Sequence, residues 1–359
     1  MKCIKVFLIL TALLLHGCLT EADPDLKNDF KTFTPLELND GWVISNPENE
    51  GINFEKLKNV YILAHSDPEL WQLKSMLVFR NGKLVSESYM KDENDRTRPR
   101  AVWSCTKQVI GILTGIAIDK GFINSVDDPI KKYFPEIINR YPDKQDITIR
   151  NLLTMQSGIE FNNDKHTPEL LGKHVTSSLD FILNLPYSGQ GNNFNYNDGN
   201  PHLLSAILQK VTGKTTAVWA EEVFFSKLDI KNYSWQQYID GITLGGYGIS
   251  IPPRELAKIA NCVLNNGIVN GNRIVSSSWI NEMIKPKVDY EKWRFGFLWW
   301  IDDLRNTFCM WGHGGQYAFV IPNKNLIVVI TSEPNTNDNH QLTFDKAMIL
   351  VDKIINASN

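Results

Sequence analysis

A β-hairpin near the start of the chain is the feature that most constrains its fold. Residues 76–80 and 83–87 are rich in apolar and β-branched side chains. The pair between them, Asn81-Gly82, favours a two-residue turn because both central positions of such a turn require positive φ. The pattern therefore predicts two antiparallel strands joined directly to one another.

Strand patterns return in the last third of the chain. They cover residues 295–301, 317–321 and 326–331, and the last two flank a turn at residues 322–325. Residues 126–240 read as mainly helical with long loops. A sheet built from both ends of the chain, with a helical insertion between them, is an α+β plan. We therefore expect an antiparallel sheet flanked by helices.

Amphipathic helices are predicted before, within and after the helical stretch. One opens at Trp103-Ser104 and ends at Gly121, a residue suited to the positive φ of a helix C-terminus. The others begin at Asn53, cover residues 203–211, follow Pro252-Pro253 as far as Gly267, and cover residues 341–355.

The first residues of the chain have the pattern of a secretory signal. Residues 1–5 carry two lysines and no acid, and residues 6–15 are almost entirely apolar. This run is too short to span a bilayer as a helix. The ending Leu15-His16-Gly17-Cys18 resembles a bacterial lipoprotein box, in which cleavage leaves a lipidated cysteine. We expect residues 1–17 to be a signal peptide and Cys18 to carry lipid; the alternative, a buried N-terminal helix, has no amphipathic pattern to support it.

The expected organisation follows from this signal. Residues 18–45 are predicted to be a tether, and residues 46–357 the folded domain. Within the domain, residues 50–125 and 241–357 would form the α/β part, and residues 126–240 the helical part. The protein would then sit in the bacterial cell envelope, held to a membrane by its N-terminal lipid on the periplasmic or extracellular side.

Composition excludes several classes of function. Lys and Arg number 37 against 40 Asp and Glu, and no basic cluster stands out, so no nucleic-acid partner is expected. Beyond Cys18, the cysteines are Cys105, Cys262 and Cys309, whose wide spacing suits neither a disulfide framework nor zinc. The loop at residues 189–194 lacks the third glycine of a dinucleotide fingerprint. We expect no metal and no cofactor.

The motif Ser-x-x-Lys occurs twice, in different local contexts. Ser88 and Lys91 lie at the end of a predicted strand, where residues three apart point to opposite faces. Ser104 and Lys107 lie at the start of a predicted helix, where residues three apart share a face. Only the second pair is therefore expected to bring an amine to a hydroxyl.

A Ser–Lys pair at a helix start can support nucleophilic catalysis. Apolar surroundings would lower the pKa of Lys107 and make its neutral amine a base for Ser104. The N-terminus of the helix would stabilise developing negative charge. The alternative is a serine that caps the helix and a lysine that is solvated.

Neighbouring segments resemble the serine β-lactamase-related hydrolases. This family includes class C β-lactamases, D-alanyl-D-alanine carboxypeptidases, esterases and 6-aminohexanoate-dimer hydrolases. The similarity covers roughly residues 50 to 355 and lies in these segments: 103–107, 115–121, 125–129, 133–136, 147–158, 245–248 and 254–258. The resemblance implies a β-lactamase/transpeptidase-like fold and an acyl-enzyme on Ser104.

The family's second motif is Tyr-x-Asn. Tyr141, Tyr196 and Tyr238 are candidates, and the loop context of Tyr196, followed by a helix, is the one in which the family places its tyrosine. By resemblance, Tyr196 would move protons together with Lys107. Asp198 departs from the usual asparagine. If it faces the site, its carboxylate would raise the pKa of Lys107 and shift the role of proton acceptor towards Tyr196; otherwise it points elsewhere.

The third motif is Lys-Thr-Gly in many relatives, and His313-Gly314-Gly315-Gln316 stands in its place here. By resemblance, the backbone N–H groups of Ser104 and Gln316 would form the oxyanion hole, and His313 would bind Tyr196 or the substrate. A structural histidine in a tight turn is the alternative. Loss of the lysine argues against efficient binding of a β-lactam carboxylate.

The sequence thus predicts a secreted serine hydrolase acting on amide or ester bonds of a small-molecule or peptide substrate. The alternative is an envelope protein of the penicillin-recognising fold that binds cell-wall peptide with little turnover. Four tryptophans near the motifs could line a pocket for apolar groups or belong to the core: Trp103, Trp299, Trp300 and Trp311.

Overall fold

The computed structural model describes residues 30, 32–172, 174–191, 193–334 and 342–359. The predicted signal peptide and the predicted lipidation site, Cys18, lie outside these residues. Within the described part of the chain, no helix is both long and apolar enough to cross a membrane.

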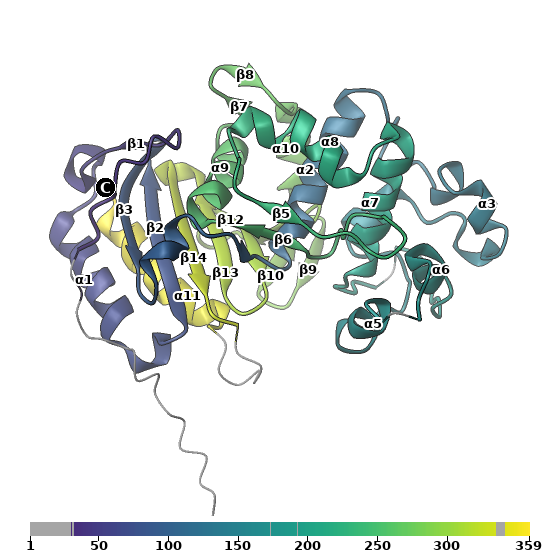
Figure 1. Ribbon diagram of the computed structural model, residues 1–359, viewed down its shortest axis with the longest axis horizontal. Helices are drawn as coiled ribbons and strands as arrows, with labels where there is room; N and C mark the ends of the chain where they lie inside the picture. Colours follow the sequence, from purple (N-terminus) through teal and green to yellow (C-terminus); the bar gives the residue numbers. More distant parts are fainter. Residues whose placement is uncertain (1–29, 31, 173, 192, 335–341) are drawn as a thin grey trace, which may run out of the picture.

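A nine-stranded sheet in the order β1-β3-β2-β14-β13-β12-β11-β10-β9 forms the centre of the molecule (Figure 1). Its strands are β1 (Val43–Ile44), β2 (Leu73–Arg80), β3 (Lys83–Tyr89), β9 (Val288–Tyr290), β10 (Trp293–Phe295), β11 (Trp300–Asp302), β12 (Thr307–Gly312), β13 (Gln316–Ile321) and β14 (Leu326–Ser332). Two small sheets are formed by β4 (Arg100–Ala101), β5 (Ser234–Trp235) and β6 (Ile249–Ile251), and by β7 (Ile268–Val269) and β8 (Asn272–Arg273).

The two ends of the chain meet in the middle of this sheet, as the α+β plan predicts. β14 pairs antiparallel with β2, from Leu326 opposite Arg80 to Ser332 opposite Leu73. The predicted hairpin is present: β2 and β3 are antiparallel, and the turn residues Asn81 and Gly82 have φ of 53° and 73°. The backbone of the turn is therefore the one that this sequence pair favours.

Three details of the sheet differ from the prediction. The edge strand β1 runs parallel to β3, so the sheet is mixed rather than purely antiparallel. The aromatic segment 295–301 is not one strand, because the chain turns between β10 and β11 with Leu298 at φ 62°. β12 was not predicted; the first four of its residues are buried, so it lacks the polar alternation that marks a half-exposed strand.

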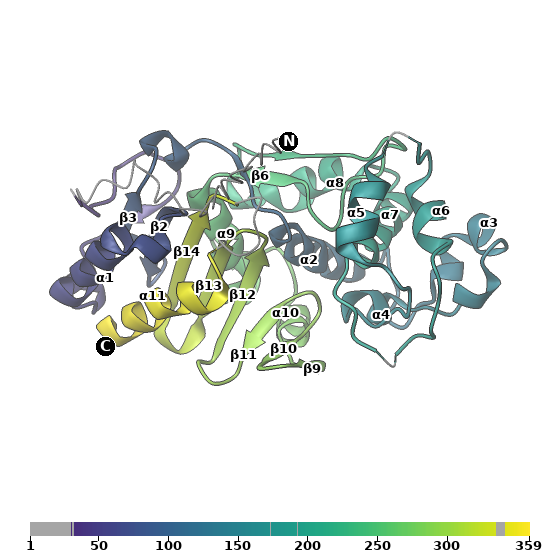
Figure 2. The same ribbon diagram turned by 90° about the horizontal axis from the view of Figure 1, so that it is seen from below.

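Helices cover both faces of the sheet (Figure 2). They are α1 (Phe54–Ser66), α2 (Cys105–Asp119), α3 (Pro135–Ile138), α4 (Ile149–Leu153), α5 (Asn163–Leu170), α6 (Ser178–Leu183), α7 (Gly199–Thr212), α8 (Thr216–Val223), α9 (Pro253–Leu264), α10 (Ser277–Met283) and α11 (Phe344–Ala357). In the two views, α1 and α11 lie together on one face, and α2 and α9 on the other.

The predicted helical stretch lies beside the sheet as a group of helices, α3 to α8 (Figure 1). Its longest helix, α7, packs against α2 and α4. α2 is buried along nearly its whole length because it lies between the sheet and this helical part. The first turns of α2 and α7 are therefore held at the junction of the two parts.

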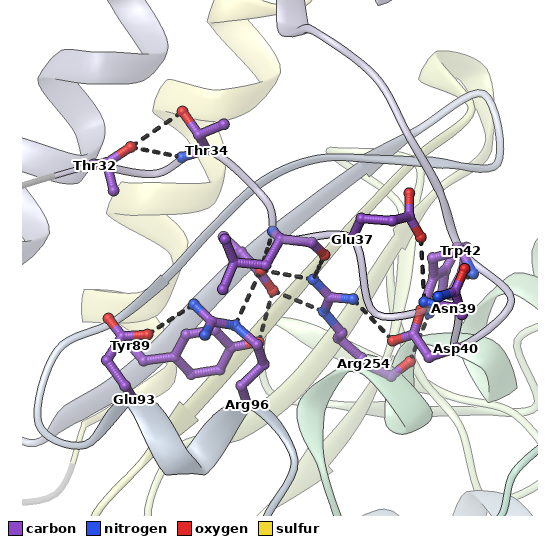
Figure 3. A network of polar contacts seen from close by, with 12 residues as sticks. Thr32, Thr34, Glu37, Asn39, Asp40, Trp42, Tyr89, Glu93, Arg96 and Arg254 are labelled. Carbon is purple, nitrogen blue, oxygen red and sulfur yellow. Dashed lines mark hydrogen bonds and ion pairs between the residues drawn. The ribbon is translucent and has the colours of Figure 1, made fainter.

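Part of the predicted tether belongs to the folded domain. Phe33 and Trp42 are buried, and β1 joins the sheet, so the expectation that residues 18–45 form a free tether is wrong from Phe33 onward. Arg254 holds this segment in place (Figure 3). Its guanidinium donates to Glu87 Oε1 at 2.7 Å, to Asp40 Oδ2 at 2.9 Å and to the carbonyl of Leu36 at 2.6 Å.

Candidate active site

Ser104 stands in the turn that opens α2. Trp103 before it has φ of 49°, a left-handed conformation that a bulky residue rarely adopts. This conformation directs the chain sharply from β4 into the helix. The side chain of Ser104 is half-buried and makes no capping hydrogen bond to the backbone of α2. The alternative of a serine that caps the helix is therefore wrong.

Lys107, one turn along α2, is fully buried and directs its ammonium at three oxygens. Nζ lies 2.7 Å from Ser104 Oγ, 2.6 Å from Asp198 Oδ1 and 2.8 Å from the carbonyl oxygen of Gly246. An ammonium has three N–H donors, so each has one acceptor. The alternative of a solvated lysine is therefore wrong.

The charge of Lys107 is stabilised by its neighbours. Burial by itself lowers the pKa of this amine. The carboxylate of Asp198 and the hydroxyl of Tyr196 raise the pKa by more than burial lowers it, so the net shift is upward. The prediction of a lowered pKa and a free amine is therefore wrong. Of the two positions considered for Asp198, the one facing the site is found.

Asp198 is positioned by α5, which the sequence did not connect with the site. Its Oδ2 accepts a hydrogen bond of 2.7 Å from Thr167 Oγ1, and its backbone N–H donates to Asn163 Oδ1 at 2.9 Å. Asn163 and Thr167 are thus functional candidates that sequence reasoning missed. They stand four residues apart on one short helix, and no motif marks them.

Two glycines allow the third acceptor to reach Lys107. A Cβ on Gly245 would overlap the carbonyl of Pro201, and a Cβ on Gly246 would lie 2.7 Å from Cβ of Asp198. The segment 245–246 can therefore lie directly on the first turn of α7. This close approach brings the carbonyl of Gly246 to the buried ammonium.

Tyr196 lies beside the Ser–Lys pair. Lys107 Nζ is 4.8 Å from the centre of its ring, which also packs on Trp300 at 5.3 Å. Burial raises the pKa of the Tyr196 phenol, contacts with Lys107 and Ser104 lower it, and the net shift is upward. The other two candidates lie elsewhere: Tyr141 bonds to Asp180, and Tyr238 to the carbonyl of Val175.

The His313–Gln316 motif forms the turn between β12 and β13. Gly314 and Gly315 have φ of 73° and 90°, and a side chain on either would collide with Pro334 or Ser332. The start of β13 lies beside the start of α2, since Cys105 Sγ donates to the carbonyl of Gln316 at 3.5 Å. His313 is exposed, and its ring meets Trp103 edge-on at 5.4 Å.

Aromatic side chains extend from Tyr196 along the sheet. Trp300 packs on Tyr196, and Trp311 packs on Trp300 with ring centres 5.0 Å apart. Trp103 is 36% exposed, whereas Trp299 is fully buried against Phe308. Trp103, Trp300 and Trp311 therefore stand near the predicted site residues, but Trp300 is buried like Trp299, and both belong to the core.

The second Ser-x-x-Lys copy forms no comparable pair. Ser88 Oγ bonds to His65 Nε2 at 2.9 Å, and Lys91 Nζ lies 4.8 Å from the ring centre of Trp71. Among the residues that the structure describes, no group of His, Cys, Asp and Glu side chains is arranged to hold a metal ion.

Comparison with known proteins agrees with this fold. Residues 74–350 match the family model for beta-lactamase. The chain is 26% identical over 298 residues to an uncharacterized protein of Alkalihalophilus pseudofirmus, with coverage of 71% of this chain and 82% of the other. It is 24% identical over 225 residues to a 6-aminohexanoate-dimer hydrolase of Paenarthrobacter ureafaciens, covering 58% of this chain and 56% of that protein.

Solved structures show the same fold. A family VIII carboxylesterase superposes with a TM-score of 0.68 at 17% sequence identity, and the match covers 88% of this chain and 99% of that one.

Proposed function

The chain belongs to the beta-lactamase family of serine hydrolases, and from this premise we propose that it cleaves an amide or ester bond through an acyl-enzyme on Ser104. The observation that carries the proposal is the 2.7 Å contact between the Ser104 hydroxyl and the buried ammonium of Lys107. A positive charge at this distance stabilises the serine oxygen as it loses its proton.

In the proposed first step, Ser104 Oγ attacks the carbonyl carbon and its proton passes to Tyr196 in the phenolate form. Lys107 stays charged because Asp198 holds its pKa above the ordinary value. The ammonium stabilises both the phenolate and the attacking oxygen. The C–N or C–O bond then breaks as Tyr196 returns the proton to the leaving group.

The second step reverses these roles. Water attacks the acyl carbon and gives its proton to Tyr196, the bond to Ser104 Oγ breaks, and Ser104 is reprotonated. We propose that the backbone N–H groups of Ser104 and Gln316 bind the oxyanion in both steps. The contact between Cys105 and the Gln316 carbonyl, which keeps β13 beside the start of α2, supports this assignment.

The surroundings of the site favour an acyl or leaving group with apolar surface. Tyr196, Trp300 and Trp311 form a continuous aromatic series. Relatives and structural neighbours include an aminohexanoate-dimer hydrolase and a carboxylesterase, which supports both amides and esters as substrate classes to be tested.

A second candidate function is binding of cell-wall peptide with little turnover. The raised pKa of Lys107 favours it, because a lysine that holds its proton more firmly is a poorer base for deacylation. On this reading, Ser104 would be acylated and the acyl-enzyme would persist.

Labelling with a fluorophosphonate probe tests the nucleophile. We expect the native protein to be labelled on the peptide that contains Ser104, and Ser104→Ala to remain unlabelled. Ser88→Ala, which removes the serine of the other motif, is the matched control and should label like the native protein. Equal labelling of Ser104→Ala would refute the assignment.

Turnover then separates the two functions. A panel of p-nitrophenyl esters, nitrocefin and D-amino-acid peptides is incubated with the native protein and with Ser104→Ala. Multiple turnovers that depend on Ser104 support the hydrolase. A single stoichiometric acylation that is stable over hours supports the binding protein.

We further propose that the protein is secreted and anchored to the bacterial cell envelope through lipid on Cys18. The signal-like residues 1–17 support this proposal. Metabolic labelling with an alkyne fatty acid should mark the native protein and leave Cys18→Ser unmarked. Equal labelling of both would contradict it.

A further inference from the structure

A series of hydrogen-bonded polar groups, buried except at the partly exposed Asp240, runs from Asp240 to the segment that holds Lys107. Ser178 donates to Asp240 Oδ2 through both its backbone N–H, at 2.7 Å, and its hydroxyl, at 2.6 Å. His202 Nε2 lies 2.8 Å from Ser178 Oγ, and His202 Nδ1 lies 3.4 Å from the backbone nitrogen of Gly245. Ser178 and His202 are almost completely inaccessible to solvent.

The direction of each hydrogen bond in this series is determined by its two ends. The Gly245 N–H can only donate, so Nδ1 of His202 must be the acceptor. Nε2 therefore carries the proton and donates to Ser178 Oγ, whose own proton goes to the carboxylate of Asp240. This requires a neutral imidazole, in agreement with burial that lowers the pKa of His202 to about 4, against the opposing effects of Asp240 and Asp198.

This series of hydrogen bonds ends at Gly245, next to an acceptor of the catalytic lysine. Gly245 precedes Gly246, whose carbonyl accepts the 2.8 Å hydrogen bond from Lys107 Nζ. Both glycines lie against the first turn of α7, which also carries His202 and Asp198. The backbone torsions of Gly245 and Gly246 lie between the Gly245 N–H and the Gly246 carbonyl, and rotation about them would turn this carbonyl away from the ammonium.

We infer that His202 is a positioning residue: through the Gly245 amide it fixes the carbonyl of Gly246, and through that carbonyl the orientation of Lys107 towards Ser104. The inference rests on the proposed function, because it gives Lys107 a part in the reaction. It assigns His202 no contact with substrate.

Ser178, His202 and Asp240 are the residue types of a catalytic triad, but they do not form a second nucleophilic centre. In a Ser-His-Asp triad the carboxylate accepts from the histidine, whereas Asp240 accepts from Ser178. Ser178 is 0% exposed, so no substrate carbonyl can approach it. The arrangement fits positioning and not a separate hydrolytic activity.

α7 offers a matched control on the same face. Ser205 is buried, like His202, and its hydroxyl donates to the carbonyl of Thr243 at 2.7 Å. It therefore ties the same loop to the same helix, two residues before Gly245. Ser205→Ala removes a structural hydrogen bond of this loop and leaves the His202–Gly245 contact in place.

Two substitutions of His202 separate its two contacts. His202→Asn retains an acceptor near the position of Nδ1 and loses the reach to Ser178. His202→Gln retains a donor near the position of Nε2 and loses the acceptor for Gly245. All variants are made in the full chain, with melting temperature and fluorophosphonate labelling measured beside steady-state kinetics on the best ester of the panel.

We expect His202→Gln to lower kcat by about 10- to 100-fold with little change in KM, because a misplaced lysine affects the reaction more than binding. His202→Asn should restore kcat to within a few-fold of native, and Ser205→Ala should retain native kcat. If His202→Gln does not fold, His202→Asn is compared with Ser205→Ala, and a kcat of His202→Asn far below that of Ser205→Ala then contradicts the inference.

Other outcomes are equally decisive. If His202→Gln and Ser205→Ala lower kcat alike, or if the loss is confined to KM, His202 has only a structural role and the inference fails. If Ser104→Ala retains activity, the proposed function fails instead, whatever the His202 variants do.

Discussion

The ammonium of Lys107 and the carboxylate of Asp198 lie 2.6 Å apart, at the first turns of α2 and α7. Both side chains are shielded from water, where opposite charges attract strongly and an unpaired charge is costly. The pair joins the sheet-bound helix α2 to the helical part of the domain. It also raises the pKa of the lysine beside the candidate nucleophile, which is the basis for proposing Tyr196 as the proton acceptor.

Removing the charge of Asp198 tests this division of roles. In Asp198→Asn, the loss of a nearby negative charge lowers the pKa of both Tyr196 and Lys107. Since the proposed active form has Tyr196 ionised, native kcat/KM should rise with pH into the alkaline range. In Asp198→Asn, this rise in kcat/KM should occur at lower pH than in the native protein.

Asp164→Asn is the control, because it removes an exposed carboxylate of the neighbouring helix α5. Its pH profile of kcat/KM should match that of the native protein. If kcat/KM of Asp198→Asn rises at the same pH as that of the native protein, Asp198 does not govern the titration of Tyr196.

Thr167 is expected to contribute through Asp198. Thr167→Val removes the donor to Asp198 Oδ2 at nearly constant volume. Loss of a hydrogen bond of about 1 kcal/mol corresponds to a decrease of about fivefold in kcat/KM. Thr167→Ser should restore the native value in the same steady-state assay; if it is as impaired as the valine variant, the hydroxyl is not responsible.

Arg254 should determine whether the N-terminal segment stays on the domain. Its guanidinium bonds to the buried carboxylate of Glu87, whose pKa is held below its ordinary value by this partner despite the opposing effect of burial. Arg254→Met leaves that carboxylate without its main partner, so the free energy of unfolding should fall by about 3–5 kcal/mol. Amide hydrogen exchange at residues 33–40 should become faster, while slow exchange there would contradict the role of Arg254 (Figure 3).

Glu50 should make stability depend on pH in the acid range. Hydrogen bonds from Lys83, Ser45 and Asn81 lower the pKa of its carboxyl to about 2. Because the folded-state pKa lies below the unfolded value, the stabilisation is complete above the unfolded pKa and is lost as pH falls towards 2.

We expect Glu50→Gln to lower the free energy of unfolding at pH 7 by about 1.5–3 kcal/mol, and to have little effect near pH 2. Urea denaturation of both proteins between pH 2 and pH 7 measures this difference. A difference that does not change with pH would rule out the ionised carboxylate as its source.

Local sequence patterns predicted much of the fold. The Asn81-Gly82 turn, the helix after Trp103 and the helix that begins at Pro253 depend on residues close together in the chain, and the structure contains all three. The missed strand β12 had no local pattern, because both of its faces are buried. The parallel β1 likewise depends on a partner strand about forty residues away.

The residues of the candidate site also fall into those that local sequence could predict and those that it could not. Ser104 and Lys107 could be paired from sequence because a helix start puts residues three apart on one face. Tyr196 and the glycine motif could be added by resemblance to a known family. The contacts of Asn163, Thr167, His202 and Gly246 could not be predicted, although Gly246 lies in a segment of the resemblance, since each is made with a partner far away in the chain.

The charge state of Lys107 illustrates the physical reason. The sequence alone determined that a lysine would reach Ser104, because this depends on the geometry of one helical turn. Whether that lysine is a neutral base or an ammonium depends on the balance of burial against a carboxylate on another helix. That balance is set by how α2, α5 and α7 pack together, and the folded structure resolves it in favour of the charged form.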